Sequence, residues 1–411
     1  MNYQSTNKLK ILNDPIYGFI RIPNSLIFDI IEHASFQRLR RVSQMGLSNL
    51  VYPGANHTRF HHALGCLHLM QKAISVLTMK GVKISKDEET ALCIAILLHD
   101  IGHGAFSHAL EHSIVTGITH EEISLKYMQQ LNKEFNGKLD LAIEIFTGKY
   151  HRLFLQQLIS SQLDIDRLDY LKRDSFYTGV AEGNISSDRL IAMMNVVNDE
   201  LVIEKKGIYS VEKFLIARRL MYWQVYLHKT GVVAENMIIN VLKRAKMLSQ
   251  SNVPLFVSHG LDFFLNTEIH PSKLTKSILE NFSELDDNDL FSALKSWKNH
   301  PDYVLSNLSK RLLDRQLLKI EFYSKHDIKS ALEKIKTKFK VHLNLDDTEI
   351  PFFVFDGVIS NIGYDSEKHP ISILHKNGKI SNLNQSSEFL NVKGLTKKVT
   401  QYYICSPKAM L

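Results

Sequence analysis

The feature that most constrains this chain is a predicted helix that is apolar on nearly all sides and ends in polar groups. Residues 85–88 (SKDE) are typical of a capping box, in which a serine and a glutamate cap the start of a helix. The run 91–98 that follows is entirely apolar, so this helix should lie in the centre of a helical bundle. It ends at 99–102 (HDIG), where polar side chains suddenly follow a buried element.

The pattern along the chain favours a mainly α protein. Apolar residues recur at helical spacing over 28–250, and shorter helices continue over 251–322, with a helix start predicted at 286–289. After residue 323 the sequence pattern changes. It predicts an amphipathic helix at 328–339 and strands at 351–355 and 371–374, and a turn at 377–378 follows the strand at 371–374. We therefore expect a helical core over residues 1–325 and a smaller C-terminal α+β lobe over 326–411.

Composition narrows the class of protein. The chain has 411 residues, of which 44% are hydrophobic and 23% charged, as in soluble globular proteins. No apolar run approaches the roughly 20 residues that span a bilayer, and the N-terminus lacks the apolar core of a signal peptide. The three cysteines have no paired spacing, so neither disulfides nor a thiolate zinc site are expected. These features predict a cytoplasmic protein without membrane partners.

Charge is a weaker guide to partners. The formal net charge is +7 and the sequence pI is about 9.0. A positive field favours anionic ligands such as nucleotides, nucleic acid or phospholipid head groups. An excess this small serves plain solubility equally well, so it identifies no partner by itself.

Histidines and carboxylates gather in four segments, 59–62, 99–108, 120–121 and 164–170. Imidazole nitrogens and carboxylate oxygens are ligands of borderline divalent metals. Adjacent His99 and Asp100 can face one ion only where the helix stops being regular, and Gly102 and Gly104 permit that departure. One histidine from an earlier helix and one aspartate from a later helix would complete the ligand set.

A single histidine on an apolar helix is more often a satisfied core or surface group than a metal ligand. The combination here is harder to explain in that way. The His-Asp pair ends a buried helix and is followed by His103 and His108. Burying this much polarity without partners would cost on the order of 1–3 kcal/mol per group. The pattern therefore indicates a metal or acid–base site.

At this point the chain resembles the HD-domain phosphohydrolases, and within them the deoxynucleoside triphosphate triphosphohydrolases. The resemblance covers about residues 10–229 and includes the strings FQRLR at 36–40, YPGA at 52–55 and DYLKRD at 169–174. It implies an HD-type helical core. The metal ligands that the resemblance implies are His62, His99, Asp100 and Asp166. It does not distinguish Fe, Mn, Zn or Ni, and it implies Mg²⁺ on the substrate phosphates.

The activity that the resemblance implies is hydrolysis of a dNTP at the α-phosphorus, with release of the deoxynucleoside and inorganic triphosphate. A metal makes water acidic enough to attack near neutral pH, and the leaving 5′-oxygen needs a proton. By resemblance His108 is the general acid, Glu111 and His120 form a supporting carboxylate–imidazole pair, and His103 touches the α-phosphate.

The same resemblance implies three kinds of substrate contact. Arginine forks suit the polyphosphate, since they keep their charge and match phosphate oxygens. An aromatic wall beside the sugar would exclude a 2′-hydroxyl. The implied residues are Arg59, Arg167 and Arg218 for the phosphates, Tyr170 and Tyr226 for the wall, Gln44 and Asp174 for the 3′-hydroxyl, and Met45 where the family often has leucine. Helix packing or solvation is the alternative for the tyrosines and for Arg218.

Some relatives are activated by nucleotides bound between subunits. The residues that match or approach that regulatory pattern are Lys10, Asn13, Glu32, Gln37 and Arg40. Glu32 replaces the usual aspartate, and Glu204 falls where an activator-binding member has a basic residue, which argues against an identical second pocket. The resemblance also implies a symmetric homo-oligomer, a tetramer or a hexamer.

Two other functions compete with dNTP hydrolysis. One is a different HD phosphohydrolase that acts on a nucleoside monophosphate or a signalling nucleotide. The other is a non-catalytic module that binds nucleotide or single-stranded nucleic acid through basic and aromatic residues. A degenerate module should have lost ligands, whereas this chain keeps all four. The joint presence of His108, His120, Tyr170 and Asp174 favours the triphosphohydrolase.

Overall fold

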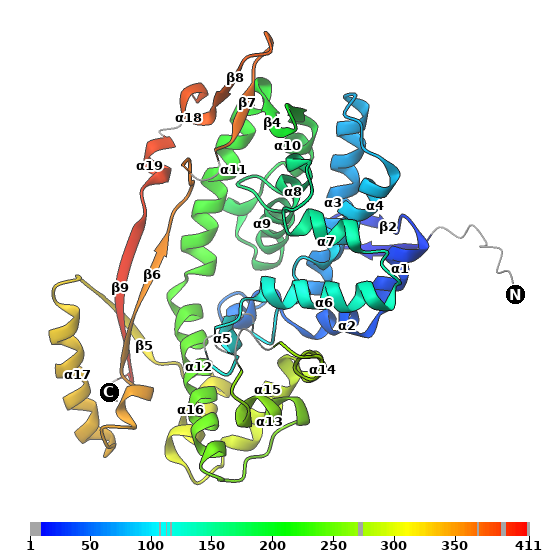
Figure 1. Ribbon diagram of the computed structural model, residues 1–411. Coiled ribbons are helices and arrows are strands. Elements are labelled where there is room, and N and C mark those ends of the chain that lie inside the picture. Colours follow the sequence, from blue (N-terminus) through cyan, green and yellow to red (C-terminus); the bar gives the residue numbers. More distant parts are fainter. Residues whose placement is uncertain are drawn as a thin grey trace, which may run out of the picture.

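The computed structural model describes residues 10–106, 108–111, 113–115, 117–269, 274–367, 370–387 and 392–408. Most of these residues are helical, and three small sheets lie at the margins of the helical body (Figure 1). The mainly α fold class with a smaller C-terminal α+β part is therefore confirmed.

The first half of the chain forms a hairpin followed by packed helices. Its elements are β1 (Ile11–Asp14), β2 (Gly18–Arg21), α1 (Ser25–Glu32), α2 (Ala34–Gln37), the 3₁₀ turns η1 (Arg38–Arg41) and η2 (Gly46–Leu50), α3 (Arg59–Met79), α4 (Lys86–Leu98), α5 (His108–Glu111), α6 (His120–Glu134), α7 (Asp140–Phe146), α8 (Leu153–Ile159), α9 (Ile165–Thr178), η3 (Ala181–Gly183), α10 (Ser187–Met193), β3 (Met194–Val197) and β4 (Glu200–Glu204).

The second half adds a long helix, a group of shorter helices and most of the strands. Its elements are η4 (Lys205–Gly207), α11 (Ile208–Met221), the π-helical turn η5 (Tyr222–Tyr226), α12 (Lys229–Gln250), α13 (His259–Asn266), α14 (Lys276–Glu284), α15 (Asp287–Trp297), α16 (Tyr303–Leu313), β5 (Lys319–Tyr323), α17 (Ile328–Leu343), η7 (Ile350–Phe352), β6 (Phe355–Asn361), β7 (Ser372–Leu374), β8 (Ile380–Asn382), α18 (Leu383–Ser386), α19 (Val392–Thr396) and β9 (Val399–Ser406).

Helix α4 has the central position that its sequence predicts. Ser85 and Glu88 form the capping box, with the Ser85 amide donating to the Glu88 carboxylate at 2.8 Å. Every residue from Ala91 to Leu98 is buried, and α4 packs against both α3 and α7. Because the helix is surrounded on all sides, its C-terminal residues are delivered into the interior of the protein.

Helices α3 and α9 approach each other closely because Gly65 has no side chain. A Cβ at this position would lie 2.0 Å from Asp169 Oδ1 and 2.2 Å from Arg173 Nη2. Helix α9 itself is capped by Asp164, whose carboxylate accepts from the Arg167 amide at 2.8 Å. The close contact lets charged side chains of α9 lie directly against α3.

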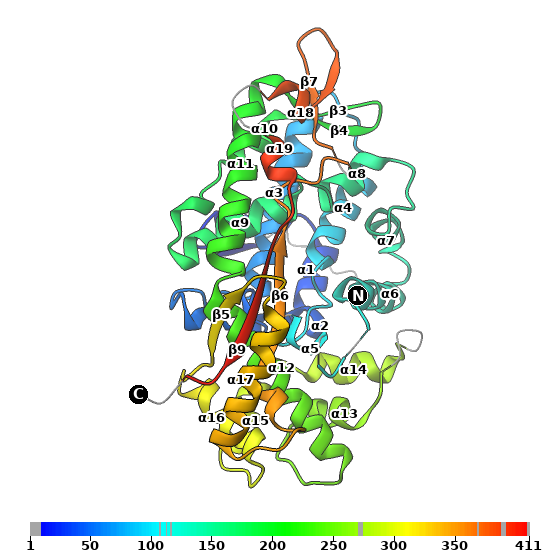
Figure 2. The same ribbon diagram turned by 90° about the vertical axis from the view of Figure 1, so that its left-hand side faces the viewer.

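The long helix α12 forms a spine between the helical core and the C-terminal strands. Strands β6 and β9 run beside α12, and α17 lies on their outer side (Figures 1 and 2). The strand order is β5-β9-β6 in this sheet, β3-β4-β7-β8 in a second sheet and β1-β2 in the N-terminal hairpin. In the first two of these sheets, strands from both sides of residue 325 pair with one another, and the division at 325 stays a prediction.

The local predictions for the C-terminal part have mixed outcomes. The strand at 371–374 and the turn at 377–378 are confirmed, since β7 pairs with β8 and Gly378 has φ +81°. The strand at 351–355 is wrong, because Ile350–Phe352 forms a 3₁₀ turn and β6 begins only at Phe355. Pro351 stands in the first turn, where its fixed φ is favourable, and the turn buries Ile350 and Phe353.

One hairpin lies inside the stretch that was expected to be helical. A two-residue turn joins strands β3 and β4, and its residues Asn198 and Asp199 have φ values of +52° and +62°. Asn and Asp are the residues that enter this left-handed region most readily, as tight hairpin turns require. Within the described part of the chain, no helix is both long and apolar enough to cross a membrane.

The ion pair between Arg244 of α12 and Asp302 offers a test of how α12 and α16 are held together. Asp302 caps α16 and accepts from Arg244 Nε at 3.1 Å. Burial alone would raise the pKa of Asp302, but hydrogen bonds from Arg244 and the Leu305 amide lower it. We expect Asp302→Asn to lose about 2 kcal/mol of unfolding free energy at pH 7 in urea denaturation.

Because the folded pKa lies below the unfolded value near 4, this stabilisation is present at neutral pH and disappears as the pH falls through the folded pKa. The difference between wild type and Asp302→Asn should therefore narrow toward pH 3. Asp347→Asn is the matched control, since Asp347 forms an exposed pair with Lys340 and its loss should not be measurable. A constant difference across this pH range would contradict the assignment.

Candidate metal centre and adjoining pocket

Three helices bring the four predicted ligands to one point. His62 comes from α3, His99 and Asp100 from the end of α4, and Asp166 from the first turn of α9. Asp166 Oδ1 lies 3.1 Å from His62 Nε2 and 3.5 Å from His99 Nε2. Asp100 lies 3.8 Å from His62 Nε2 and 3.5 Å from His99 Nε2. Ligands bound at about 2.1 Å to one tetrahedral cation stand about 3.4 Å apart, so the set fits a metal.

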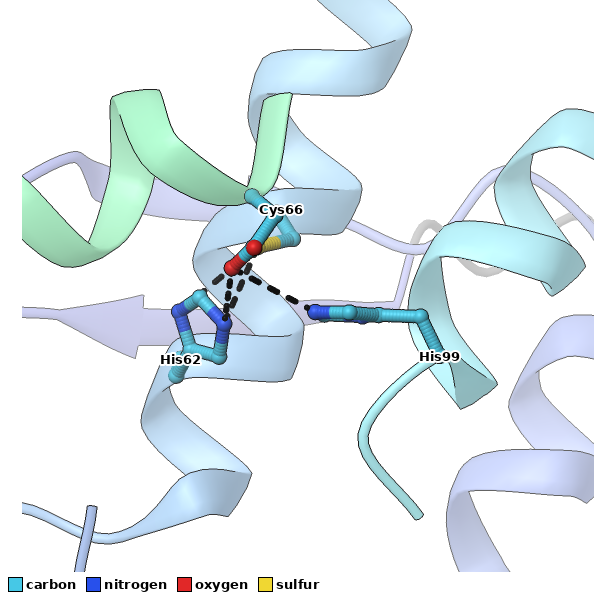
Figure 3. A group of neighbouring side chains, drawn as sticks. His62, Cys66 and His99 are labelled. Atoms are coloured by element: carbon cyan, nitrogen blue, oxygen red, sulfur yellow. Dashed lines mark hydrogen bonds and ion pairs between the residues drawn. The ribbon is translucent and has the colours of Figure 1, made fainter. Parts of the chain in front are cut away.

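The orientation of both imidazoles supports a metal site. His62 Nδ1 bonds to Asp169 Oδ2 at 2.8 Å, and His99 Nδ1 bonds to the Ile96 carbonyl at 2.6 Å. Both rings therefore direct Nε2 toward the shared carboxylates (Figure 3). His99 Nε2 is buried and has no hydrogen-bond partner among the described residues. A buried nitrogen left without a partner is what a metal ligand presents.

The protonation equilibria of the site reflect the same crowding of charge. Burial opposes the ionised forms throughout, but the mutual contacts outweigh it. The histidines lower the pKa of Asp166 well below its usual range. Cys66 and the carboxylates of Asp166 and Asp169 raise the pKa of His62, and Asp100 and Asp166 raise the pKa of His99. A divalent cation at this point would supply the positive charge that the carboxylates attract.

A buried chain of charged groups lies behind His62. Asp169 accepts from Arg173 through two hydrogen bonds of 2.8 and 3.0 Å, and Arg173 Nη1 donates to Asp14 at 2.8 Å. Burial would raise the pKa of Asp169, but Arg173 and His62 lower it to about 2. Asp169 is therefore a permanent carboxylate that holds the His62 ring. The sequence placed Asp169 and Arg173 in a family string without indicating this role.

Cys66 lies beside the metal ligands, which sequence reasoning did not anticipate. Its Sγ lies 3.6 Å from both ring nitrogens of His62, one helical turn away on α3 (Figure 3). Together with His62, His99 and Asp166 it forms a group whose ligand atoms all lie within 4.8 Å of one another. Burial raises the pKa of the thiol. The i, i+4 spacing to His62 was the available signal.

Arg59 and Arg38 hold the corner that follows α4. Arg59 Nη1 donates to Asp100 Oδ2 at 2.5 Å, so it contacts a predicted metal ligand. Arg38 is completely buried and donates to the carbonyls of Ile101 and His103 at 2.8 and 2.7 Å. Burial lowers the pKa of Arg38, whose charge is met by carbonyl dipoles instead of a carboxylate. The hydrogen bonds from Arg38 therefore hold the irregular backbone that follows His99 and Asp100.

The predicted catalytic histidines lie next to this corner. His103 and His120 stack with ring centroids 3.8 Å apart and an interplanar angle of 17°. His120 Nδ1 lies 3.2 Å from Glu111 Oε1, which is the carboxylate–imidazole pair that the resemblance implies. Burial and the nearby Arg59 lower the pKa of His103 to about 3, so its ring is neutral near pH 7. His108 begins α5, but its side chain lies outside the described residues.

A cavity of about 640 Å³ opens beside the metal ligands. The predicted residues that line it are Gln44, Met45, Arg59, Asp100, His103, His120, Asp166, Arg167, Tyr170, Asp174 and Tyr226. Phe106 and Glu121, which lie in the predicted segments 99–108 and 120–121 but had no assigned role, also line it. Nothing in the sequence indicated the other lining residues, among them Tyr222, Gly231, Glu235 and Ile238. Ligand sites typically have this size and a few convergent polar groups.

The three predicted phosphate arginines have different positions. Arg167 lines the cavity and is held by the Ser161 carbonyl at 2.8 Å and by Asp164 at 3.1 Å. Arg218 is not among the described residues that line the cavity; its Nη1 donates to Gln162 at 3.1 Å. This hydrogen bond directs the Arg218 side chain toward the loop that precedes α9, and a direct contact between Arg218 and a ligand stays a prediction.

Part of the cavity lining is aromatic. Tyr170 and Tyr226 meet edge to face, with ring centroids 6.0 Å apart at 80°. Tyr226 lies in the π-helical turn η5, whose extra residue per turn alters the direction of the side chains that follow α11. Its hydroxyl donates to Asp174 Oδ2 at 2.7 Å. Sequence could place the tyrosines near one another only by resemblance, because their helices are separate in the chain.

Asp287 holds two loops of the cavity in place. Its carboxylate accepts from the amide of Ser43 at 2.8 Å and from the amide of Phe106 at 2.9 Å. Phe106 has φ +48°, a backbone conformation that costs energy for a residue with a side chain. The predicted helix start at 286–289 is confirmed, but its use as an anchor for the cavity was not visible in the sequence.

The predicted regulatory residues lie near the N-terminal hairpin and α1–η1. Arg40 Nε donates to Gln37 Oε1 at 2.7 Å, and the Arg40 guanidinium lies 3.7 Å from the centre of the Phe60 ring. Lys10 Nζ lies 2.9 Å from the centre of the Phe28 ring. Asn13 belongs to β1 and Glu32 ends α1. A regulatory site here stays a prediction.

Comparison with protein families identifies the class. Residues 59–174 match the HD domain, and residues 185–255 match the HD associated region. The HD match begins at Arg59 on α3 and ends at Asp174 on α9, so it contains all four predicted metal ligands. The chain belongs to the HD-domain phosphohydrolases, a family of metal-dependent enzymes.

Individual relatives support this assignment. The crystal structure of a phosphohydrolase from Bacteroides thetaiotaomicron is 51% identical in sequence and has a TM-score of 0.93. The match covers 98% of this chain and 100% of that one. Uncharacterized protein YwfO of Bacillus subtilis is 32% identical over 98% of this chain and 93% of its own length. A Dictyostelium discoideum protein named deoxynucleoside triphosphate triphosphohydrolase SAMHD1 homolog is 32% identical to this chain. The match covers 59% of this chain and 51% of that protein.

The buried partner of His62 can be tested by metal binding. We expect Asp169→Asn to weaken metal affinity about 10- to 100-fold, because the neutral amide no longer fixes and polarises the imidazole. Competition with a chromophoric chelator measures the affinity. Asp188→Asn is the control, since Asp188 forms an exposed ion pair with Lys72 on the same helix α3. Unchanged affinity in a folded Asp169→Asn protein would contradict the role.

Proposed function

We propose that the protein hydrolyses dNTPs at the α-phosphorus to a deoxynucleoside and inorganic triphosphate. The observation that carries this proposal is that one cavity is lined by the carboxylates Asp100 and Asp166 of the candidate metal site, by Arg167 and by the paired rings of Tyr170 and Tyr226. These groups suit a reacting phosphate, a polyphosphate and a sugar, and we assign the sugar to the part lined by the two tyrosines, which we call the sugar end. The amoebal relative that bears the name of such an enzyme adds support.

The chain's own groups are suited to bind and orient the polyphosphate. A bound divalent metal supplies the Lewis acid that makes an attacking water acidic enough near neutral pH. Arg167 keeps its charge at all relevant pH values and presents its guanidinium to the cavity. His103 is neutral and buried at the cavity wall, so it can direct a ring nitrogen toward the α-phosphate without adding charge. Arg59 orients Asp100 from the same wall.

Proton transfer to the 5′-oxygen is assigned to the α5–α6 region. Glu111 Oε1 lies 3.2 Å from His120 Nδ1, so the carboxylate can fix the orientation of this imidazole. His108, in the same short helix as Glu111, is proposed as the acid that protonates the leaving group. The proposal also includes Mg²⁺ on the substrate phosphates, an activating nucleotide, a homo-oligomer and a cytoplasmic location.

The reaction itself can be tested with purified protein and each of the four dNTPs, alone and mixed. We expect stoichiometric deoxynucleoside and inorganic triphosphate, resolved by ion-exchange chromatography. Asp166→Ala should lower the rate at least about 100-fold while the thermal unfolding temperature stays within a few degrees, because it removes one metal ligand. Chelation should stop the wild-type reaction, and added Mn²⁺ or Fe²⁺ should restore it. Release of pyrophosphate or monophosphate instead would contradict the proposal.

The tyrosine wall predicts a preference for deoxyribose. We expect wild type to use dNTPs at least about tenfold better than NTPs in kcat/KM, because Tyr170 and Tyr226 leave little room beside the sugar. Tyr170→Ala should reduce this ratio by opening space for a 2′-hydroxyl. Tyr209→Ala is a control, since Tyr209 is 63% exposed on α11. Equal use of both sugars by wild type would contradict the wall.

A further inference from the structure

Asp174 lines the cavity, and hydrogen bonds hold both oxygens of its carboxylate. It is 2% exposed, and each of its oxygens has its own donor. His57 Nε2 lies 2.7 Å from Oδ1, and the Tyr226 hydroxyl lies 2.7 Å from Oδ2. An ionised carboxylate accepts about four hydrogen bonds, so Asp174 can still accept one more from a ligand.

His57 is the donor that does not line the cavity. Its side chain is buried, and its ring stacks on Tyr177 with centroids 4.4 Å apart at an angle of 13°. A carboxylate can only accept, so the hydrogen lies on Nε2 and is donated to Asp174. Nδ1 is buried and has no hydrogen-bond partner among the described residues. An apolar ring would fill this space without leaving a nitrogen unpaired, so the hydrogen bond to Asp174 is the reason for a histidine here.

The backbone of His57 is also tied to the cavity. Its carbonyl accepts a hydrogen bond from the main-chain N–H of Gln44 at 3.0 Å. This bond lies next to the antiparallel β-bridge between Ser43 and Thr58. Gln44 lines the cavity. One residue therefore connects, through its side chain and its main chain, the two positions that the resemblance assigns to the 3′-hydroxyl.

We propose that His57 is a positioning residue that fixes the carboxylate of Asp174 and so makes the pocket selective for a free 3′-hydroxyl. This inference rests on the proposed function, since it takes the sugar end of the cavity as given. His57 touches no substrate. It acts by holding one oxygen of Asp174 from behind while Tyr226 holds the other, which leaves the carboxylate one orientation toward the sugar.

The test compares His57→Gln with His57→Leu. The glutamine Nε2 reaches about as far as the histidine Nε2 and keeps a donor, whereas leucine fills space and removes it. The substrates are a dNTP and the corresponding 2′,3′-dideoxy analogue. We expect His57→Leu to lower the dNTP-to-dideoxy ratio of kcat/KM about tenfold, the worth of one hydrogen bond, with most of the loss in the dNTP. His57→Gln should restore most of the ratio.

Controls separate this role from a packing role. His68→Leu is the matched variant, because His68 also stacks on a tyrosine, Tyr17, at 5.0 Å and 23°, and does not line the cavity. It should leave the ratio unchanged. Thermal unfolding identifies general destabilisation. If His57→Leu lowers both substrates equally, or if glutamine gives no rescue, His57 has only a packing role and the proposal is wrong.

A binding measurement distinguishes failure of this inference from failure of the proposed function. Calorimetry with a deoxynucleoside and its 2′,3′-dideoxy analogue reports the sugar contact without chemistry. If wild type prefers the deoxynucleoside and His57→Leu loses that preference, the inference holds even when no dNTP is hydrolysed. If wild type hydrolyses dNTPs but binds both nucleosides equally, the proposed function holds and the inference is wrong. Binding of neither nucleoside would overturn the sugar assignment and this inference with it.

Discussion

The structure depends on a buried chain of ionic hydrogen bonds that runs from Asp14 through Arg173 and Asp169 to His62. All four side chains are essentially inaccessible to solvent. Burying charges is expensive, and the cost is offset only where each charge has a well-placed partner. Here each group has one, and Asp14 also accepts from the Ile16 and Tyr17 amides.

This chain links three elements that are distant in the sequence. Asp14 ends β1, Arg173 and Asp169 belong to α9, and His62 belongs to α3. Removal of one member would leave its neighbour in the chain buried with a lost partner, so the members depend on one another. The N-terminal hairpin therefore contributes to the metal centre although it supplies no ligand. Gly65 is the geometric condition for this, because any side chain there would occupy the position of Asp169.

The sequence was informative where chemistry is local and silent where it depends on tertiary contacts. The capped apolar helix ending in His99 and Asp100 could be read directly, because helical periodicity and capping are local signals. The convergence of His62 and Asp166 on that corner was reachable only by resemblance. Other contacts left little or no trace in the sequence. Nothing in the spacing of His57 or Asp287 indicates which loop or side chain each one contacts, and Cys66 had only its i, i+4 spacing to His62.

The errors have the same origin. The 351–355 segment has the aromatic and β-branched composition of a strand, yet its apolar side chains pack into the core through a 3₁₀ turn. Tertiary burial overrides propensity in such short segments. The β3–β4 hairpin was missed because the flanking helices dominate the periodicity, although Asn198 and Asp199 supply a turn signal.

Helix α12 contacts the cavity on one side and the C-terminal part of the chain on the other. Gly231, Glu235 and Ile238 of α12 line the cavity. From the same helix, Asn236 donates to the Tyr403 hydroxyl at 3.2 Å and Asn240 donates to the Phe352 carbonyl at 3.0 Å. Because a helix moves as a rigid rod, contacts on its outer side fix the residues on its inner side.

Through α12 the strands therefore support the sugar end of the cavity without touching a ligand. The π-helical turn η5 immediately precedes α12 and carries Tyr226. A shift of α12 would move this turn, and with it the hydroxyl that holds Asp174. The C-terminal part has no motif of its own, and its physical contribution is to keep the wall of the cavity in register with a metal centre built on α3, α4 and α9.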